Sequence, residues 1–284
     1  MKTADFDPVA YKAAQRRMWG GVAAGWEKWW PTIERTMGAV TERIAERAQV
    51  RPGHTVLDVA TGIGEPALTV APRVRPGGKV VATDQAPEML DIARRRAAAA
   101  AAENVEFLEA DAERLAFPSG AFDAVVCRFG LMFLPDVGRF LRRVHALLVP
   151  GGRFVTAVWD QPEHSPPDDL GVAIAMSMFG LPGPPPGAPT FYGLAGGVLE
   201  GEMARAGFRR IRAERVPADF EWPSIEICQQ YLRDVIPFFA TVAEQPPDRQ
   251  AEFWRVHAAA ARKFAGPDGT IRSRSTAICI VGVT

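Results

Sequence analysis

The chain has 284 residues, and its 33 Lys and Arg residues balance 33 Asp and Glu residues, so the formal net charge is zero. A chain of this length can bury one full α/β core with additions. The charge balance and the lack of a long basic run argue against nucleic acid as a partner. The densest basic cluster, the three arginines at 94–96, is expected on the solvated face of a helix.

The first residues contain acids and a proline where a signal peptide needs an apolar core. No run approaches the roughly 18 apolar residues of a membrane-spanning helix, and the chain is therefore expected in the cytoplasm. Three cysteines, Cys127, Cys228 and Cys279, are too far apart for a metal spacing or a disulfide set. They are expected to pack in the core, and we predict no metal site.

Residues 1–48 are expected to form a helical N-terminal cap segment that is rich in tryptophan. Trp26 and Trp30 are four residues apart and would share one helix face, which predicts that they pack the helix onto a sheet. An alternative is that Tyr11, Trp19 and Trp26 form an aromatic wall over a bound ligand.

Residues 49–160 alternate short apolar runs with helical patterns, which is typical of βαβ units and a parallel sheet. Right-handed crossovers would bring the carboxyl ends of the strands to one edge, where ligands bind. Strands are predicted near 55–60, 79–83, 105–109, 122–128 and 152–159. Helices are predicted near 65–74, 87–102 and 136–148.

The first predicted strand runs into a turn with two glycines, Gly62 and Gly64, and then into a helix start. Such a turn exposes backbone N–H groups beside a helix N-terminus and holds nucleotide-like ligands. Gly62, Gly64 and Ala67 also satisfy a dinucleotide-binding fingerprint, with Asp84 twenty residues further on. An NAD(P)-dependent oxidoreductase is therefore one reading of this turn.

Two further acids favour a different ligand. Asp58 lies inside the end of the first strand, where a nicotinamide site has no use for it, but a carboxylate there can hold an ammonium group. Asp111 closes the third apolar run, and it can accept a hydrogen bond from the amino group of an adenine. Together they favour a nucleoside that carries an amino acid.

Beyond residue 160 the pattern changes. Residues 161–195 are rich in proline around one apolar helix, and we interpret them as a lid. Residues 196–223 and 270–284 are expected to complete the core sheet, the first with a helix and a strand, the second with a strand at 276–283. Residues 224–269 have helical spacing and are interpreted as a helical insertion that caps the substrate.

The chain resembles the class I S-adenosylmethionine-dependent methyltransferases, and most of all the quinone-biosynthesis C-methyltransferases and their small-molecule relatives. The resemblance covers roughly residues 50–160 and depends on five blocks in the family's order. These blocks are residues 58–64 around the glycine turn, 82–90, 109–113, 117–123 and 147–154.

The resemblance implies an α/β fold: a Rossmann-like seven-stranded sheet, mostly parallel with an antiparallel last strand, and helical cap insertions. It implies S-adenosylmethionine as cofactor, S-adenosylhomocysteine as product, and methyl transfer to a small, largely apolar metabolite that is quinone-like or a natural product. The chain would act as a monomer or homodimer. The alternatives are the oxidoreductase and a non-catalytic protein that binds S-adenosylmethionine.

The resemblance also implies site residues. Asp58 and the turn would line the methionine and ribose end, Asp84 would bind the ribose hydroxyls, and Asp111 the adenine amino group. The full set expected at the cofactor is Asp58, Ala60, Thr61, Gly62, Gly64, Asp84, Gln85, Met89, Asp111, Ala112 and Arg128. The set expected at the acceptor is Tyr11, Trp19, Trp26, Phe129, Met132, Trp159 and Tyr192.

Two positions depart from the family pattern. Ala60 replaces the usual first glycine, which costs little if its φ angle is negative. Met132 and Phe133 stand where the quinone enzymes have an Arg-Asn pair, and this change favours a more apolar acceptor pocket.

Methyl transfer from a sulfonium is an in-line displacement with an activated leaving group, so the protein has mainly to align the acceptor and exclude water. A base is needed only if the acceptor must lose a proton early. The sequence offers Asp160, His164, Tyr192 and His257 as candidates, with Glu163 beside them, and it singles out none.

Overall fold

The structure is a computed structural model, and it describes residues 6–161 and 168–284. Its main sheet has seven strands in the order β3-β2-β1-β4-β5-β9-β6. Strands β1 to β5 run parallel, whereas β9 is antiparallel to both β5 and β6. The predicted fold is therefore confirmed. The strands are β1 Thr55–Val59, β2 Lys79–Asp84, β3 Val105–Glu109, β4 Phe122–Arg128, β5 Leu148–Trp159, β6 Arg209–Pro217 and β9 Thr276–Val283.

Helices cover both faces of this sheet. Helix α5 shows why: its buried side chains Phe140, Leu141, Val144 and Leu147 recur at helical spacing and form one apolar stripe. The α-helices of the core are α2 Trp30–Ala48, α3 Ala67–Val70, α4 Pro87–Ala99, α5 Val137–Leu147 and α7 Val198–Arg205. Short 3₁₀ turns follow several strands and helices: η1 Ala71–Val74, η2 Ala112–Arg114 and η3 Leu131–Phe133.

The N-terminal region forms two helices, because α1 Pro8–Lys28 ends at Trp29 and α2 begins at Trp30. Proline fits the first turn of a helix but not its interior, so Pro31 starts a new helix here. The prediction that Trp26 and Trp30 share a face of one helix is therefore wrong, although both pack against the same buried residues. The Trp26 indole donates a hydrogen bond to the Val235 carbonyl, 3.1 Å away, whereas the Trp30 ring packs against another helix.

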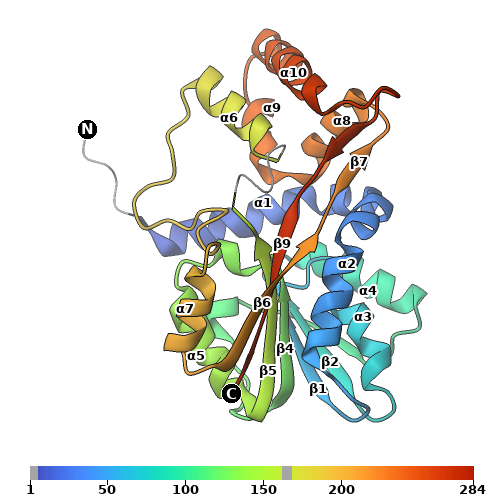
Figure 1. Cartoon of the computed structure of the whole chain (residues 1–284), viewed down its shortest axis with the longest axis vertical. Coiled ribbons are helices and arrows are strands. Elements are labelled where there is room, and N and C mark those ends of the chain that lie inside the picture. The colour runs from blue at the N-terminus through green and yellow to red at the C-terminus, as the bar shows by residue number, and fades with distance from the viewer. Residues whose placement is uncertain (1–5, 162–167) are drawn as a thin grey trace.

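A group of elements that we call the cap lies above the carboxyl ends of the strands (Figure 1). Its small antiparallel sheet of β7 and β8 was not predicted from the sequence. The cap consists of α6 Asp168–Phe179, β7 Phe220–Trp222, α8 Ile225–Val235, η5 Pro237–Phe239, α9 Ala240–Ala243, α10 Pro247–Ala261, η6 Arg262–Phe264 and β8 Ile271–Ser273. Each helix within residues 6–161 and 168–284 is too short or too polar to cross a membrane.

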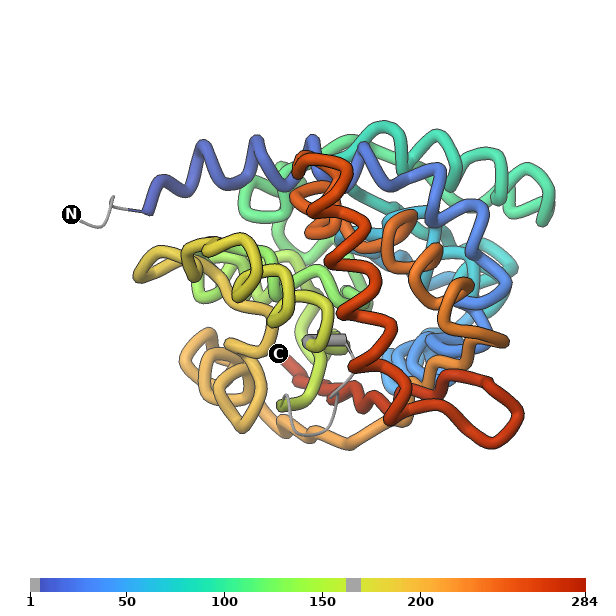
Figure 2. Tube along the Cα trace, turned by 90° about the horizontal axis from the view of Figure 1, so that it is seen from above, coloured from blue at the N-terminus to red at the C-terminus, as the bar shows by residue number. Residues whose placement is uncertain are grey.

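Helix α1 lies between the sheet edge and the cap, and in the view from above it runs beside α4 with α10 crossing toward it (Figures 1 and 2). Its contact with α8 is very close: a Cβ atom on Gly25 would lie 1.8 Å from the Asp234 carbonyl oxygen. On the other side, Trp19 and Trp26 pack against buried Ile63 and Met89. Helix α1 therefore contacts both the glycine turn and the cap.

Candidate functional site

The three acids singled out by the sequence end three neighbouring strands. Asp58 is in β1, Asp84 is the last residue of β2, and Asp111 follows β3 by two residues. Because β3, β2 and β1 are parallel neighbours, all three acids lie at the same carboxyl edge. This is the edge at which open α/β sheets bind ligands.

Asp58 is fully buried at the start of the glycine turn. Its Oδ2 accepts hydrogen bonds from the Thr61 hydroxyl at 2.6 Å and from the Ala67 N–H at 2.9 Å. Its Oδ1 has no partner among the described residues. Burial raises the pKa of this carboxyl to about 7, although the two hydrogen bonds lower it. A buried carboxylate with a free oxygen is suited to a cationic ligand group, since such a charge needs a partner.

The glycine turn leaves room for a ligand. Gly62 has a φ angle of 55° and Gly64 one of 107°, which favour glycine. A Cβ atom on Gly62 would meet nothing within 4 Å, so a ligand can approach the backbone there. The Gly62 N–H donates to the Asp84 Oδ2 at 2.8 Å.

Ala60 would replace the family's glycine at little cost only if its φ angle were negative, and it is not. Its φ angle is 57°, in the left-handed region, which costs an L-residue about 1–2 kcal/mol. Phe129, after the adjacent β4, has a φ angle of 62°. Strained residues of this kind concentrate at functional sites. Gly130 packs against Ala60 so closely that a Cβ atom on it would lie 2.6 Å from the Ala60 Cβ.

Asp84 connects the turn to the next helix. Its Oδ2 binds the Gly62 N–H, and its Oδ1 accepts a hydrogen bond from the Ala86 N–H at 2.9 Å. Burial raises its pKa, and these backbone hydrogen bonds lower it. Gln85 beside it is half-buried, and Met89 is buried under α1. Asp84 therefore fixes the shape of the turn, and the ribose contact that the family resemblance implies stays a prediction.

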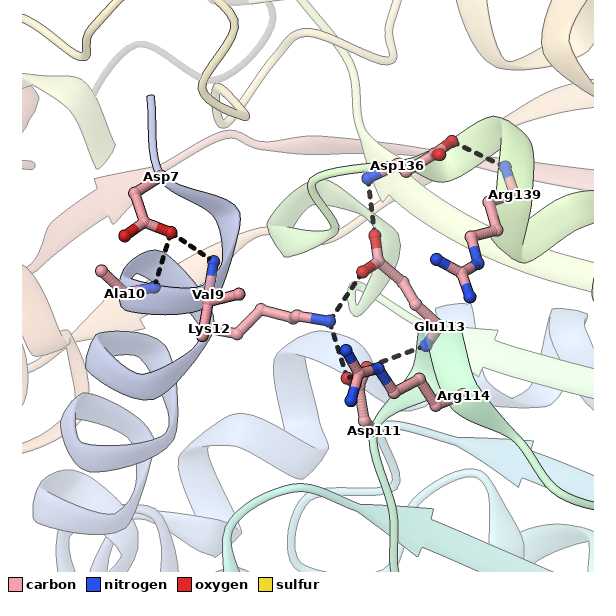
Figure 3. A network of polar contacts seen from close by, with 9 residues as sticks. All are labelled: Asp7, Val9, Ala10, Lys12, Asp111, Glu113, Arg114, Asp136 and Arg139. Atoms are coloured by element: carbon pink, nitrogen blue, oxygen red, sulfur yellow. Dashed lines mark hydrogen bonds and ion pairs between the residues drawn. The ribbon is translucent and has the colours of Figure 1, made fainter. Parts of the chain in front are cut away.

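Asp111 is held by helix α1 (Figure 3). The Lys12 ammonium lies 2.6 Å from the Asp111 Oδ2 and 2.8 Å from the Glu113 Oε2. Ala112 begins the 3₁₀ turn η2 between the two acids. The sequence did not predict this cation beside the acid expected to bind adenine.

Arg128 points toward helix α2. Its Nη1 donates a hydrogen bond of 2.7 Å to the Thr41 hydroxyl, and the side chain is buried. Burial lowers the pKa of this guanidinium, and the nearby carboxylates of Glu65 and Asp58 raise it. Its contact with a cofactor stays a prediction, since its hydrogen bond to Thr41 leads away from the turn.

Four aromatic side chains expected at the acceptor, those of Trp19, Trp26, Phe129 and Trp159, are joined by Phe133 and Phe191 into one connected chain of ring contacts. It runs from α1 through η3 and residue 191 to the ends of β5 and β4. The centroid distances are 6.0 Å for Trp26–Trp19, 5.2 Å for Trp19–Phe133, 6.5 Å for Phe133–Phe191, 6.3 Å for Phe191–Trp159 and 4.4 Å for Trp159–Phe129. We call these six residues the aromatic wall.

The other predicted acceptor residues lie around this wall. Met132 is buried in η3, next to Phe133. Tyr192 packs its ring edge-on to Phe191 with centroids 5.0 Å apart. Tyr11 lies near the start of α1, in contact with Phe6, and burial raises its pKa to about 12.

The structure separates the candidate bases. Asp160 is buried after β5, and its Oδ2 pairs with the Arg215 Nε at 2.6 Å. His257 is buried in α10 with its Nδ1 3.4 Å from the Gln229 amide, and burial lowers its pKa to about 4. His164 and Glu163 lie outside the described residues. A role for any of them, or for Tyr192, stays a prediction.

The expectation that all three arginines at 94–96 face solvent is wrong for Arg96. Its guanidinium donates to the Ile63 carbonyl of the glycine turn at 2.5 Å and lies 3.7 Å from the Trp30 ring centroid. A cation on a ring face is stabilised by the ring quadrupole. Sequence reasoning also missed Lys12, Glu113 and Phe191, whose partners are distant in the chain.

This sheet order, with an antiparallel strand between β5 and β6, and this acid-lined glycine turn define the fold of the class I S-adenosylmethionine-dependent methyltransferases. A crystal structure of the YcgJ protein from Bacillus subtilis has the same fold, with a TM-score of 0.60, 22% identity and coverage of 86% of this chain and 97% of that one. Residues 38–170 of the chain match the model of the ubiE/COQ5 methyltransferase family.

One relative is the demethylmenaquinone methyltransferase of Thermus thermophilus, 45% identical over 120 residues, or 42% of this chain and 54% of the relative. The chain thus spans about half the length of such curated relatives. A phosphoethanolamine N-methyltransferase of Haemonchus contortus, solved with phosphomonomethylethanolamine and S-adenosylhomocysteine, has a TM-score of 0.54 and 17% identity, with coverage of 86% of this chain and 52% of that one.

Proposed function

We propose that the chain is an S-adenosylmethionine-dependent methyltransferase that acts on a small, largely apolar acceptor of quinone-like or natural-product type. The observation that carries this proposal is the buried Asp58 carboxylate, whose Oδ1 is free, beside the open backbone of Gly62. A nicotinamide dinucleotide places a pyrophosphate at such a turn, where a buried acid would repel it. An amino acid ammonium would instead complete the partners of Asp58.

The remaining cofactor contacts follow the sheet edge. Asp84 faces the turn and is proposed to accept a hydrogen bond from the ribose, at a lone-pair position that the backbone N–H groups of Gly62, Gln85 and Ala86 leave free. Asp111, at the next strand end, is proposed to accept one from the adenine amino group. The match of residues 38–170 to the family model supports this assignment, since it includes all three acids.

The bound cofactor would supply an activated methyl group on a sulfonium. The chain's own residues have two tasks: to hold the acceptor in line with that carbon and to keep water out. The methyl group would form a bond to the acceptor as its bond to sulfur broke, and the sulfur would keep the electron pair. The aromatic wall provides an apolar surface for both tasks.

The acceptor is proposed to be apolar because aromatic side chains lie at the ends of β4 and β5. Trp159 stacks on Phe129, and Phe133 contacts both Trp19 and Phe191. The relative from Thermus thermophilus, a demethylmenaquinone methyltransferase, supports a quinone-like acceptor. We further propose a cytoplasmic monomer or homodimer; light scattering and cell fractionation test these two points.

Thermal unfolding with S-adenosylmethionine, S-adenosylhomocysteine and NAD tests the proposal. A ligand at about 100 times its Kd stabilises the folded state by about 2.7 kcal/mol. We expect stabilisation by the first two ligands, and transfer of a labelled methyl group to a short-chain quinol. Stabilisation by NAD alone would support the oxidoreductase reading, and cofactor binding without transfer to any acceptor would support a non-catalytic protein.

A further inference from the structure

Lys12 joins two acids that lie about a hundred residues away in the chain (Figure 3). Its ammonium donates to the Asp111 Oδ2 at 2.6 Å and to the Glu113 Oε2 at 2.8 Å. The side chains of Lys12 and Glu113 are only 20% and 6% exposed. Exposed ion pairs contribute little, but a cation with two partly buried partners is held more firmly.

Glu113 is fixed on its other side as well. Its Oε1 accepts a hydrogen bond of 2.6 Å from the Asp136 N–H, and Asp136 in turn caps α5 by accepting from the Arg139 N–H at 2.7 Å. The Glu113 N–H donates to the Asp111 Oδ1 at 2.9 Å. The network therefore runs from α1 through η2 to the start of α5.

Asp111 still has capacity for a ligand. A carboxylate offers about four lone-pair positions, and its two oxygens accept one bond each, from Glu113 and Lys12. The Arg114 Nε is more distant, at 3.9 Å. Because both oxygens are already fixed, the remaining positions have a defined direction, as hydrogen-bond recognition requires.

Helix α1 is anchored differently at its two ends. Its second half is bound to the cap: Lys28 and the Trp29 indole both donate to the Asp234 carboxylate, at 2.6 and 2.8 Å. Its first half reaches the core through Lys12 and through an ion pair of 2.6 Å between Arg16 and Glu109. That second pair is exposed, at 50% and 46% of its side chains.

We propose that Lys12 is a positioning residue of the cofactor site, which holds Asp111 in place to read the purine 6-amino group and holds the first half of α1 closed over the bound nucleoside. This inference rests on the proposed function, since that function assigns Asp111 to adenine. The purine specificity of the site then depends on a residue in a helix outside the matched family segment.

The test compares Lys12→Met with the matched control Arg16→Met, which removes the exposed pair on the same helix. Two probes are titrated by calorimetry: S-adenosylhomocysteine, and S-inosylhomocysteine, in which a 6-oxo group replaces the amino donor. We expect the original chain to prefer the adenosyl probe. Lys12→Met should weaken adenosyl binding by about tenfold and reduce the preference, whereas Arg16→Met should change both by less than about twofold. Lys12→Arg should restore the preference.

The possible outcomes distinguish a failure of the proposed function from a failure of the role proposed for Lys12. If the original chain binds neither probe, the proposed function fails. If it binds the adenosyl probe and Lys12→Met keeps the same affinity and preference, or binds more tightly, only the role of Lys12 is overturned. The role of Lys12 would also be overturned if Lys12→Met lost affinity for both probes by the same factor as Arg16→Met. Such a loss would report only the anchoring of α1. Circular dichroism and melting curves confirm that each variant is folded.

Discussion

The cofactor half and the acceptor half of this molecule are built in different ways. In the cofactor half, Asp58 bonds Thr61 and Ala67, and Asp84 bonds Gly62 and Ala86. Each of these hydrogen bonds joins residues that are at most 22 positions apart in the chain. In the acceptor half, the aromatic wall joins rings from residues 19 to 191. The glycine turn of the cofactor half is therefore encoded locally, whereas the aromatic wall, like the contact of Asp111 with Lys12, depends on the packing of distant segments.

The largest expected effect concerns the contact between α1 and α8, which the fold of both halves depends on. Gly25→Ala should destabilise the fold by about 3 kcal/mol, because its Cβ would overlap the Asp234 carbonyl oxygen and force the helices apart. Denaturant unfolding measures the loss. Gly21→Ala, on the same helix with nothing near its Cβ, is the control and should be neutral or stabilising by up to about 1 kcal/mol. Equal effects of the two variants would contradict the close approach.

A charge removed at Asp84 should affect the cofactor half alone. Asp84→Asn keeps an acceptor oxygen but loses the charge, and we expect S-adenosylhomocysteine binding to weaken by about 1.5–3 kcal/mol. Asp84→Ala should also lower the melting temperature, since it leaves the Gly62 and Ala86 N–H groups without their acceptor. Calorimetry and melting curves separate the two losses. An unchanged affinity in Asp84→Asn would show that this acid only shapes the turn.

The raised pKa of Asp58 predicts that both the stability of the fold and the affinity of the cofactor site depend on pH. The folded-state pKa of about 7 lies above the unfolded value of about 3.9, so ionisation costs stability and the unliganded fold should lose stability as pH rises from about 4 to 7. A cationic ligand needs the ionised form, so its affinity should rise by about tenfold from pH 6 to pH 8.

Asp58→Asn is the control for that pH series. It should bind S-adenosylmethionine more weakly and show a flat profile over the same range. The neighbouring Arg128 and Glu65 remain in this variant, so a profile that persists would assign the titration to another group.

The smallest expected effect tests the acceptor half. Phe191 is 39% exposed, and Phe191→Ala removes the link between Phe133 and Trp159 in the aromatic wall. Because aromatic pairs contribute about 0.5–1.5 kcal/mol, the KM for the acceptor should rise by about two- to tenfold. Steady-state kinetics measures this rise, and S-adenosylhomocysteine affinity should stay unchanged. Val198→Ala, at an exposed apolar residue outside the wall, is the control; a matching rise there would refute the specific role of Phe191.

The same contrast explains how far the sequence could predict the structure. Strands β1 to β5 and the three acids were predictable, because buried apolar runs, glycine turns and strand ends are local signals. The antiparallel β9 followed from the family resemblance. The break between α1 and α2 was not predicted, although Pro31 marks it.

Other features had no local signal. Ala60 combines a positive φ with close packing against Gly130, and the half-buried Arg96 contacts Trp30 and the Ile63 carbonyl. Strands β7 and β8 are three residues each and pair across about 50 positions, too short and too distant for a periodicity argument. Lys12 and Asp111 are separated by 99 positions.

If α1 tilts to release a ligand, its close contact with α8 at Gly25 is the expected pivot. No side chain separates α1 from the Asp234 backbone at Gly25, so the two helix backbones lie closest to each other there. At 1.5 Å per residue, Lys12 lies about 20 Å along the helix from Gly25. A tilt of about 10° around Gly25 would move the Lys12 ammonium by about 3.5 Å. This is enough to separate it from both carboxylates while the second half of α1 keeps its contact with α8.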